Sequence, residues 1–289
     1  MKTTVLIDFN NLAIRHFLTK DVAGFTSNPD LSLWRYTTFN SIYTMLMKFK
    51  KVKEVVVAID DRVSWRKLYF KRYKESRKKK RDTSTINWPL LYAELNDLAT
   101  QIFHDIPFKV LKVRNAEADD IIGIICLDGK DKYIVVSNDE DYLQLYSNKT
   151  RIYNPSKQDF VVCNNTERFL NEKCLIGQPK DDIFNIKTPL DWPVGKRKPG
   201  FGIKSAEKVL EAGLDEWLEQ NNLKKRFHIN RNLIDFKRIP EVVKNRVLKR
   251  YHEYTYPDPK NIYHFFKRNR FRGFLEEINQ VENRLLQLY

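Results

Sequence analysis

The sequence predicts an α/β protein with a mostly parallel central sheet flanked by helices, followed by an all-helical region. Three short apolar runs rich in β-branched residues are typical of strands buried on both faces of a parallel sheet. They cover Thr3 to Asp8, Glu54 to Asp60 and Tyr133 to Asn138, and each precedes a helix-like pattern. Because 42% of the 289 residues are hydrophobic, the chain can bury a sizeable core, and we do not expect disorder.

The remaining elements follow in chain order. Phe108 to Val113 is expected to form a fourth strand, and Arg151 to Cys163 a hairpin that turns between Pro155 and Asp159. After Asn164 the strand signal fades, which divides the chain into a core over residues 1–164 and a helical region over residues 165–289. Helix patterns in that region cover Thr166 to Ile176 with Thr166 as the N-cap, Lys204 to Leu218, Pro240 to Tyr254, and Asn261 to Leu288 with a break near Gly273.

The composition narrows the function classes. A net charge of +15 and an isoelectric point near 9.5 indicate an anionic partner, with nucleic acid ahead of an acidic membrane surface or an acidic protein. Cys126, Cys163 and Cys174 are too scattered to suggest a disulfide framework or a zinc site. The sequence has neither the pattern of a secretory leader nor an apolar run of about 18 residues. We therefore expect a cytoplasmic protein that is neither secreted nor embedded in a membrane.

Acidic residues stand where an α/β fold places its active site. The three expected strands end at or just before Asp8, Asp60 and Asp139. In an open α/β sheet the carboxyl ends of the strands line the ligand crevice, so we expect these side chains to meet although they are far apart in sequence. A single aspartate at a strand end is more often a cap or a turn residue. The coincidence of three such residues favours a functional site.

Further carboxylates extend this group. Glu117, Asp119 and Asp120 open an expected helix, Asp141 lies beside Asp139, and Asp181 and Asp182 share a loop. Crowded carboxylates destabilise a fold unless cations neutralise them, and ligation by oxygen alone selects magnesium or manganese over zinc. Two ions about 4 Å apart are the usual arrangement for phosphodiester hydrolysis. The sequence therefore predicts a divalent metal centre.

The segment from Arg62 to Asp82 is the most basic part of the chain. It has eleven Lys or Arg residues and two acids, so it holds nine of the fifteen net positive charges. Aromatic residues such as Trp65 and Tyr69 alternate with basic ones such as Lys71 and Arg72, which suits base stacking beside phosphate neutralisation. A solvated charged helix would not need the aromatic residues, and a localisation signal would not lie inside a globular chain. We therefore expect nucleic-acid contact here.

A glycine turn precedes the helix expected from Lys204 onward. Gly200 and Gly202 let the backbone approach a phosphate closely, and the N–H groups at a helix start favour an anion. Three basic residues just before the turn strengthen this expectation of DNA binding: Lys196, Arg197 and Lys198. The same pattern also occurs at ordinary turns, so its meaning depends on the rest of the chain.

In this order, the motifs resemble those of the 5′ nuclease superfamily, which includes flap endonucleases and the 5′ nuclease domain of bacterial DNA polymerase I. The motifs are LID at Asp8, AID at Asp60, EADD from Glu117 to Asp120, SNDEDYLQL with Asp139 and Asp141, and the GxxxDD loop with Asp181. The likeness spans nearly the whole chain and is closest to the ribonuclease H of T-even-type bacteriophages. It implies a PIN-like nuclease core with a helical arch over residues 62–87 and a helix-turn-helix DNA clamp over residues 199–210.

The resemblance also assigns roles to individual residues. The ligands of the first metal would be Asp8, Asp60, Glu117, Asp119 and Asp120, and those of the second Asp139, Asp141 and Asp181. At the arch, Lys74 and Arg77 would stabilise charge on the scissile phosphate, Tyr73 would stack on a base, and Arg66 would be a further catalytic cation. Asn11 and Arg15 match residues near the opening of the site.

Two features depart from the family pattern. Gln178 follows Gly177 at a position where the family usually has aspartate. One carboxylate of the second metal site is therefore missing, although an amide oxygen or water can ligate magnesium. The stretch from Asp182 to Gly200 is also longer than in most members, and in this it resembles the T-even branch.

The implied activity is 5′-to-3′ exonuclease, flap endonuclease and ribonuclease H-type cleavage by two-metal catalysis, which would remove RNA primers and 5′ flaps in phage DNA replication. The implied partners are branched or flap DNA, RNA–DNA hybrids, a sliding clamp and a single-strand-binding protein, with potassium at the DNA clamp; we expect a monomer. Two alternatives stay open. Gln178 suggests a branched-DNA-binding protein with weakened catalysis, and the acidic α/β plan is shared with PIN-type ribonucleases. Leu285 to Tyr289 is expected to pack as a helix rather than to bind a sliding clamp.

Overall fold

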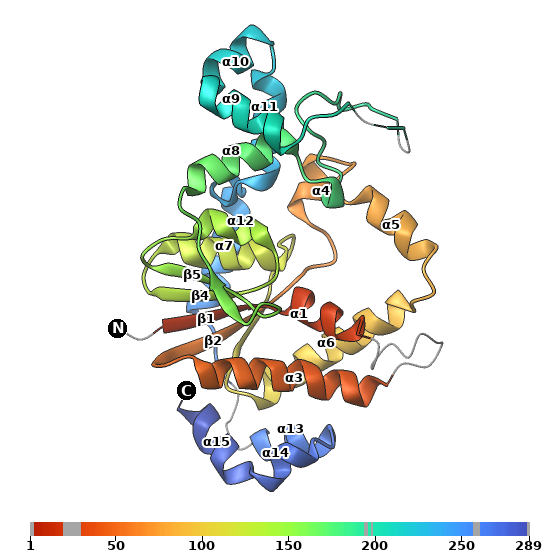
Figure 1. The fold of residues 1–289 in the computed structure, drawn as a ribbon. Helices are drawn as coiled ribbons and strands as arrows, with labels where there is room; N and C mark the ends of the chain where they lie inside the picture. The colour runs from red at the N-terminus through yellow and green to blue at the C-terminus, as the bar shows by residue number, and fades with distance from the viewer. Residues whose placement is uncertain (1–2, 20–29, 194–195, 198, 257–260, 288–289) are drawn as a thin grey trace.

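A six-stranded sheet in the order β3-β2-β1-β4-β5-β6 forms the centre of the molecule (Figure 1). The computed structural model describes residues 3–19, 30–193, 196–197, 199–256 and 261–287. The parallel strands are β1 (Thr3–Asp8), β2 (Val52–Ile59), β3 (Lys109–Lys112), β4 (Lys132–Val136) and β5 (Thr150–Asn154). The short β6 (Asp159–Val161) returns antiparallel to β5, so the mostly parallel sheet and the hairpin are both confirmed.

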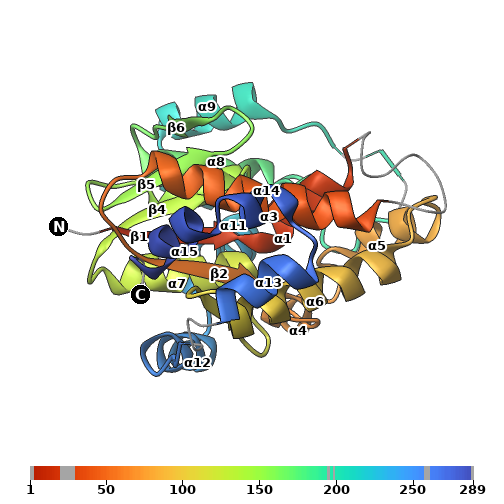
Figure 2. The same ribbon diagram turned by 90° about the horizontal axis from the view of Figure 1, so that it is seen from below.

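The sheet is covered by helices on both faces, which explains why its strands are continuous apolar runs. Val5 and Ile7 of β1 belong to one core, while Leu6 belongs to the other. The helices on the first face are α1 (Phe9–Phe17), α3 (Leu31–Lys48) and α6 (Trp88–Asp105), with α13 (Ile262–Arg268), α14 (Arg272–Glu276) and α15 (Ile278–Leu286) packed behind them. Figure 2 shows these last three helices from below, beside α3 and α6.

The opposite face of the sheet carries α7 (Ala118–Asp128) and α12 (Glu241–His252). Close packing explains the glycine in the middle of α7. A Cβ atom at Gly123 would lie 2.9 Å from Cγ of Phe236 in the short helix η3 (Phe236–Arg238). Gly123 therefore lets η3, from the carboxyl-terminal half of the chain, pack closely against α7.

A third hydrophobic cluster lies beyond the sheet, at the top of Figure 1. It is formed by α8 (Thr166–Ile176), α9 (Ile203–Ala212), α10 (Leu214–Gln220) and α11 (Lys224–Ile234). The residues after position 164 are helical as expected, but they pack in three separate places: in this cluster, against α7, and behind α3 and α6. The division at residue 164 thus marks the end of the strands.

Several helix boundaries differ from the predictions. The N-cap of α8 is Asn165 rather than Thr166, because the Asn165 side chain accepts a 2.8 Å hydrogen bond from the Arg168 amide. The helix expected from Lys204 to Leu218 is two helices divided at Gly213, whose φ of 101° does not suit a helix.

The last helical stretch is also broken at a different place. The break falls at residues 269–271, where Arg270 has a φ of 56°, and Gly273 lies inside α14. The third helical segment is shorter than predicted, because Pro240 is its N-cap and the helix ends at His252. No pattern predicted α11, whose apolar side chains are few and whose helix is stabilised by packing in the third cluster.

Between β2 and α6, the chain forms an arm that contains the predicted arch. It consists of α4 (Trp65–Tyr69) and α5 (Glu75–Asp82), drawn in orange on the right of Figure 1. Lys74 links them in a left-handed conformation with a φ of 54°. Within the described parts of the chain, no helix is both long and apolar enough to cross a membrane.

Candidate metal centre

The register of the sheet brings three distant acidic residues to one edge. β1 pairs Asp8 with Ala58 of β2, and Ile7 with Val136 of β4, so Asp60 and Asp139 follow beyond the same edge. A cavity there is lined by seven carboxylates: Asp8, Asp60, Glu117, Asp119, Asp139, Asp141 and Asp181. The predicted convergence of the strand ends is thus present in the structure, and Asp120 is the one predicted ligand that does not line the cavity.

Asp8 and Asp60 are held by neutral donors. Asp8 accepts hydrogen bonds from the Asn11 amide at 3.1 Å, the Ser137 hydroxyl at 3.2 Å and the Tyr142 hydroxyl at 3.1 Å. Asp60 accepts one from the Ala118 amide at 2.8 Å. Burial and the nearby Asp60 charge raise the pKa of Asp8 to about 7, and burial raises the pKa of Asp60 as well. Both carboxylates therefore favour a compensating cation.

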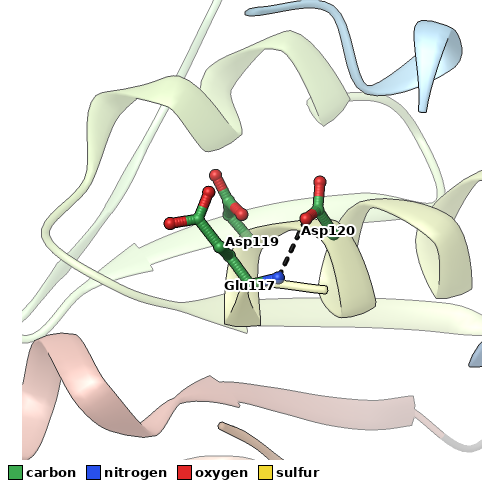
Figure 3. A group of neighbouring side chains, drawn as sticks. All are labelled: Glu117, Asp119 and Asp120. Atoms are coloured by element: carbon green, nitrogen blue, oxygen red, sulfur yellow. Dashed lines mark hydrogen bonds between the residues drawn. The ribbon is translucent and has the colours of Figure 1, made fainter. Parts of the chain in front are cut away.

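The first turn of α7 contributes three acids whose ligand atoms lie within 4.8 Å of one another (Figure 3). Glu117 accepts hydrogen bonds from Ser64 and Tyr73, both at 2.9 Å, and pairs with Lys74. Burial opposes its ionisation, but the charges of Lys74 and Arg66 outweigh that effect and lower the pKa of Glu117. Glu117 is therefore ionised at the wall of the cavity.

Asp120 faces away from the cavity. Its carboxylate accepts the Glu117 backbone N–H at 2.9 Å, the dashed line in Figure 3, and the Trp65 indole N–H at 3.0 Å. Arg66 lies 2.9 Å from the same carboxylate, and Asp120 is fully buried. In this structure Asp120 fixes the start of α7 and the base of the arm, and Asp119 rather than Asp120 reaches the cavity.

The other side of the cavity is formed by Asp139, Asp141 and Asp181. Lys180 on the short helix η2 (Pro179–Asp181) places its ammonium nitrogen 2.8 Å from Asp139 and 3.4 Å from Asp141. Burial and the Asp139 charge nevertheless raise the pKa of Asp141 to about 6. The Oδ1 atom of Asp141 is buried and accepts no hydrogen bond from the described residues. The Lys173 ammonium nitrogen lies 3.9 Å from this oxygen. A group of carboxylates in which one oxygen accepts no such hydrogen bond fits a hard divalent cation.

Gln178 does not take the place of the missing carboxylate. It does not line the cavity, and its backbone pairs with Ile183 through hydrogen bonds of 2.7 and 3.1 Å. Gly177 makes this turn with a φ of 75°, and a Cβ there would lie 2.4 Å from the Ile183 carbonyl oxygen. The loop is thus shaped by Gly177, and it presents Asp181 and Lys180 to the cavity.

Two of the predicted arch residues line the acidic cavity, and two are buried beside it. Lys74 and Arg77 line the acidic cavity, where Arg77 pairs with Asp181. Tyr73 and Arg66 expose only 3% and 2% of their surface. In this conformation Tyr73 acts on the site through its hydrogen bond to Glu117 and has no free face for base stacking.

A second cavity adjoins the first beneath the arm. The two share Asn10, Asp60, Lys74, Arg77 and Glu117 in their walls. The rest of the second wall has two acids, Asp61 and Glu75, and five basic side chains: Arg62, Lys67, Lys78, Arg81 and Lys112. An acidic pocket therefore continues into a basic one, and Lys74 and Arg77 stand at the junction.

The other predicted DNA contacts are spread over the surface. Asn11 and Arg15 line the acidic cavity, where Arg15 donates a 2.8 Å hydrogen bond to Ser156. Arg72 is turned inward and donates to the carbonyl oxygens of Leu190 and Trp192 at 2.8 and 2.6 Å. The exposed predicted residues are Lys71, Lys196, Arg197, Gly200, Gly202 and Lys204, the last near the start of α9. Lys198 lies outside the described residues.

Sequence reasoning missed the groups that hold the acids in place. Lys180, Ser137 and Tyr142 each contact a cavity carboxylate directly. Ser137 lies two residues before Asp139 and Tyr142 next to Asp141, so neighbouring polar residues in a motif were the available signal. Lys180, between Gln178 and Asp181, could have been suspected on the same ground.

Comparison with known proteins agrees with this arrangement. The sequence model of the 5′-3′ exonuclease N-terminal resolvase-like domain matches residues 3–174, and that of the T4 RNase H C-terminal region matches residues 165–281. The ribonuclease H of Enterobacteria phage T4 is 25% identical over 95% of this chain and 94% of its own length. A flap endonuclease of Psychromonas ingrahamii is 25% identical over 73% of this chain and 77% of its own.

The fold has solved counterparts. A bacteriophage T5 flap endonuclease, whose structure was determined with DNA and metal ions, superposes with a TM-score of 0.64 at 16% identity, over 87% of this chain and 98% of that one. The likeness to the T5 structure establishes the fold, and the exonuclease domain model covers more than half of the sequence. With its acidic cavity at the carboxyl edge of the sheet, the chain belongs to the 5′-3′ exonuclease family of nucleases.

Proposed function

We propose that this nuclease is a structure-specific 5′ nuclease that removes RNA primers and short 5′ flaps during DNA replication, with magnesium as its metal and manganese as a substitute. The observation that carries the proposal is the junction of two cavities, one lined by seven carboxylates and the other by arginines and lysines. A nucleic-acid strand in the basic cavity would bring a phosphate to the acidic one. The ribonuclease H and flap endonuclease names of the relatives support this choice of substrate.

The acidic residues would hold two divalent ions. Such ions lower the pKa of the attacking water and neutralise charge on the phosphate. Asp8, Asp60, Glu117 and Asp119 form one group of donors, and Asp139, Asp141 and Asp181 the other. Ser137 and Tyr142 keep Asp8 in position through their hydroxyl groups. The T5 relative was solved with metal ions, which supports a divalent requirement here.

Lys74 and Arg77 would act on the phosphate itself. Both stand at the junction of the cavities and are paired with Glu117 and Asp181. A phosphate at that position would offer each cation a second anionic partner, and the resulting hydrogen bonds would be strengthened by charge. Water would add to phosphorus in line with the P–O3′ bond, which breaks. The water gives up a proton to solvent and O3′ takes one up, so the released 5′ fragment ends in a 3′ hydroxyl and the downstream product keeps the 5′ phosphate. Tyr73 would hold Glu117 in position through its hydroxyl group.

The duplex part of the substrate would rest on the glycine turn and the start of α9, with the N–H groups of that helix start directed at a phosphate. Gly200 and Gly202 have open space where a side chain would stand. We propose a helix-turn-helix clamp here, with potassium between backbone carbonyls and phosphate. We further propose that the protein acts as a monomer in the host-cell cytoplasm. Its protein partners would be a sliding clamp and a single-strand-binding protein.

A cleavage assay with three labelled substrates tests the function. A 5′ flap, an RNA–DNA hybrid and single-stranded RNA are incubated with and without magnesium. We expect magnesium-dependent 5′-end products from the first two substrates. Tight flap binding without cleavage would instead indicate a DNA-binding protein with lost catalysis, and cleavage of single-stranded RNA alone would indicate a PIN-type ribonuclease.

The variant Asp139→Asn gives an internal control for the same assay. We expect it to lose cleavage at saturating magnesium and to keep its affinity for flap DNA, since binding depends on the basic cavity. Full activity in this variant would remove Asp139 from the proposed site.

A further inference from the structure

The two halves of the acidic cavity are neutralised differently. On one side, Asp8 and Asp60 accept hydrogen bonds from amides and hydroxyls, and within the described parts of the chain neither has an ion-pair partner within 4.0 Å. The cations on this side, Lys74 and Arg66, pair with Glu117 and Asp119 instead. On the other side, every carboxylate faces a cation. Asp139 and Asp141 share Lys180, and Asp181 pairs with Arg77. Lys173 lies farther from Asp141, at 3.9 Å, and makes its shorter contact of 3.3 Å with Glu140. The Asp139–Asp141 pair is therefore in direct contact with a cation, whereas the Asp8–Asp60 pair is not.

Lys180 is brought to this place by the fold of its loop. The turn at Gly177 and the pairing of Gln178 with Ile183 close the loop. Further hydrogen bonds then tie the loop to the arm: the Lys74 amide donates to the Asp181 carbonyl at 2.9 Å, and the Ser76 amide to the Asp182 carboxylate at 2.7 Å. The backbone that carries Lys180 is thus fixed from two sides.

The Lys180 side chain, in contrast to its backbone, is free to move away from the two carboxylates. It is 49% exposed, and its ammonium group reaches both Oδ atoms of Asp139, at 2.9 and 2.8 Å. A side chain that is half in solvent can leave these partners without disturbing the core, because lysine has a long flexible stem. The ammonium group and a divalent ion would compete for the same carboxylate oxygens.

We propose that Lys180 is the resident cation of the Asp139–Asp141 side, and that a divalent ion enters this side only by displacing it. This inference rests on the metal dependence proposed above. It predicts unequal metal affinities in the absence of DNA: tight binding beside Asp8 and Asp60, and weak binding beside Asp139 and Asp141. Gln178 stands where the family usually has a carboxylate, and this loss should weaken metal binding beside Asp139 and Asp141 further.

Manganese binding to the DNA-free protein tests the proposal, with free Mn²⁺ measured by electron paramagnetic resonance. We expect one tight and one weak class of site in the unmodified protein. Lys180→Met should tighten the weak class by about tenfold or more, because a competing unit charge a few ångströms away is removed. Lys180→Arg keeps a cation in place and should leave the weak class within about twofold of its original affinity.

The control variant is Lys157→Met. Lys157 also lines the acidic cavity, but it forms no ion pair with the described residues. Its loss removes the same charge from the same cavity and should change either affinity by no more than about twofold. If Lys157→Met tightens the weak class as much as Lys180→Met does, the effect is one of net charge, and the proposal for Lys180 is wrong.

Two outcomes separate this inference from the function on which it rests. If the unmodified protein binds manganese and Lys180→Met leaves the weak class unchanged, the displacement mechanism is refuted while metal dependence stands. If the unmodified protein binds no manganese at millimolar concentration, the metal centre itself is refuted. Thermal melting of each variant in EDTA confirms that folded proteins are being compared.

Discussion

Replacing Asp8 by asparagine should stabilise the metal-free protein at neutral and higher pH. Burial and the Asp60 charge raise the pKa of Asp8 from 3.8 to about 7, which corresponds to about 4 kcal/mol at about 1.36 kcal/mol per pH unit. A raised carboxylate pKa stabilises the fold fully below the unfolded value of 3.8, and this contribution is lost as the pH rises through about 7. At higher pH the native state therefore carries a buried charge that asparagine lacks.

The expected gain is smaller than the full shift. Oδ1 of Asp8 accepts the Asn11 amide, and an asparagine oxygen can do the same. Oδ2 accepts two hydroxyl groups, from Ser137 and Tyr142. An asparagine NH₂ group cannot accept from them, so both hydroxyls must turn, at a cost of about 1 kcal/mol each. We therefore expect a net gain of about 1–2 kcal/mol, or about 2–6 °C in Tm for a chain of this size.

Thermal melting in EDTA at several pH values measures this effect. The gain from Asp8→Asn should be largest at about pH 8 and should become a loss of about 1 kcal/mol at about pH 5, because native Asp8 is protonated there and the linkage contribution changes by about 1.36 kcal/mol per pH unit below about pH 7. With magnesium added at about pH 8, the unmodified protein should have the higher Tm of the two. The reason is that the ion stabilises only a protein that keeps its carboxylate. A gain that is equal at both pH values, or a loss at the higher one, would refute the electrostatic reasoning.

Three further predictions follow from the geometry of the arm and its loop. Lys74→Ala should lower kcat for flap cleavage by about 10²-fold or more with little change in DNA affinity, since Lys74 faces the site of the phosphate; the opposite pattern would make it a docking residue. Gly177→Ala should destabilise the protein by about 2–4 kcal/mol, since a Cβ would meet the Ile183 carbonyl; denaturant unfolding measures this, and an unchanged midpoint would contradict the loop geometry. Replacing both Lys78 and Arg81 with alanine should weaken flap binding and make the slope of log affinity against log salt shallower by about 1.4–1.8; an unchanged slope would show that the basic cavity does not meet phosphates.

The sheet and its acidic edge were predictable because their signals are local. A strand buried on both faces must be apolar where it is buried, and Val5 to Ile7 and Val55 to Ile59 are continuous apolar runs of this kind. Parallel strands then bring Asp8 and Asp60 to the same edge whatever the details of packing. The positions of these side chains follow from chain direction alone, so sequence order was enough.

The carboxyl-terminal helices were less predictable because packing decides where they begin and end. The segment after Asn261 forms three short helices, and four phenylalanines from the first two helices and the turn between them pack on Phe39 of α3. Residues 269–271 break the first of them so that Phe271 and Phe274 can both reach that core. Periodicity shows that these residues are apolar and helical, but it does not show which distant side chain they meet.

The same limit explains why the acids of α7 could not be assigned from sequence. Glu117, Asp119 and Asp120 leave the first helical turn in different directions, and spacing alone places Glu117 and Asp120 on one face. In the structure the Arg66 guanidinium lies between these two, 3.0 Å from Glu117 and 2.9 Å from Asp120, and it donates to the Leu233 carbonyl at 2.8 Å. Arg66 thus joins the arm, α7 and the end of α11, three segments that are far apart in sequence. Packing between those segments, and not spacing in the sequence, therefore buries Asp120 against the guanidinium and the Trp65 indole and leaves Glu117 and Asp119 at the cavity wall.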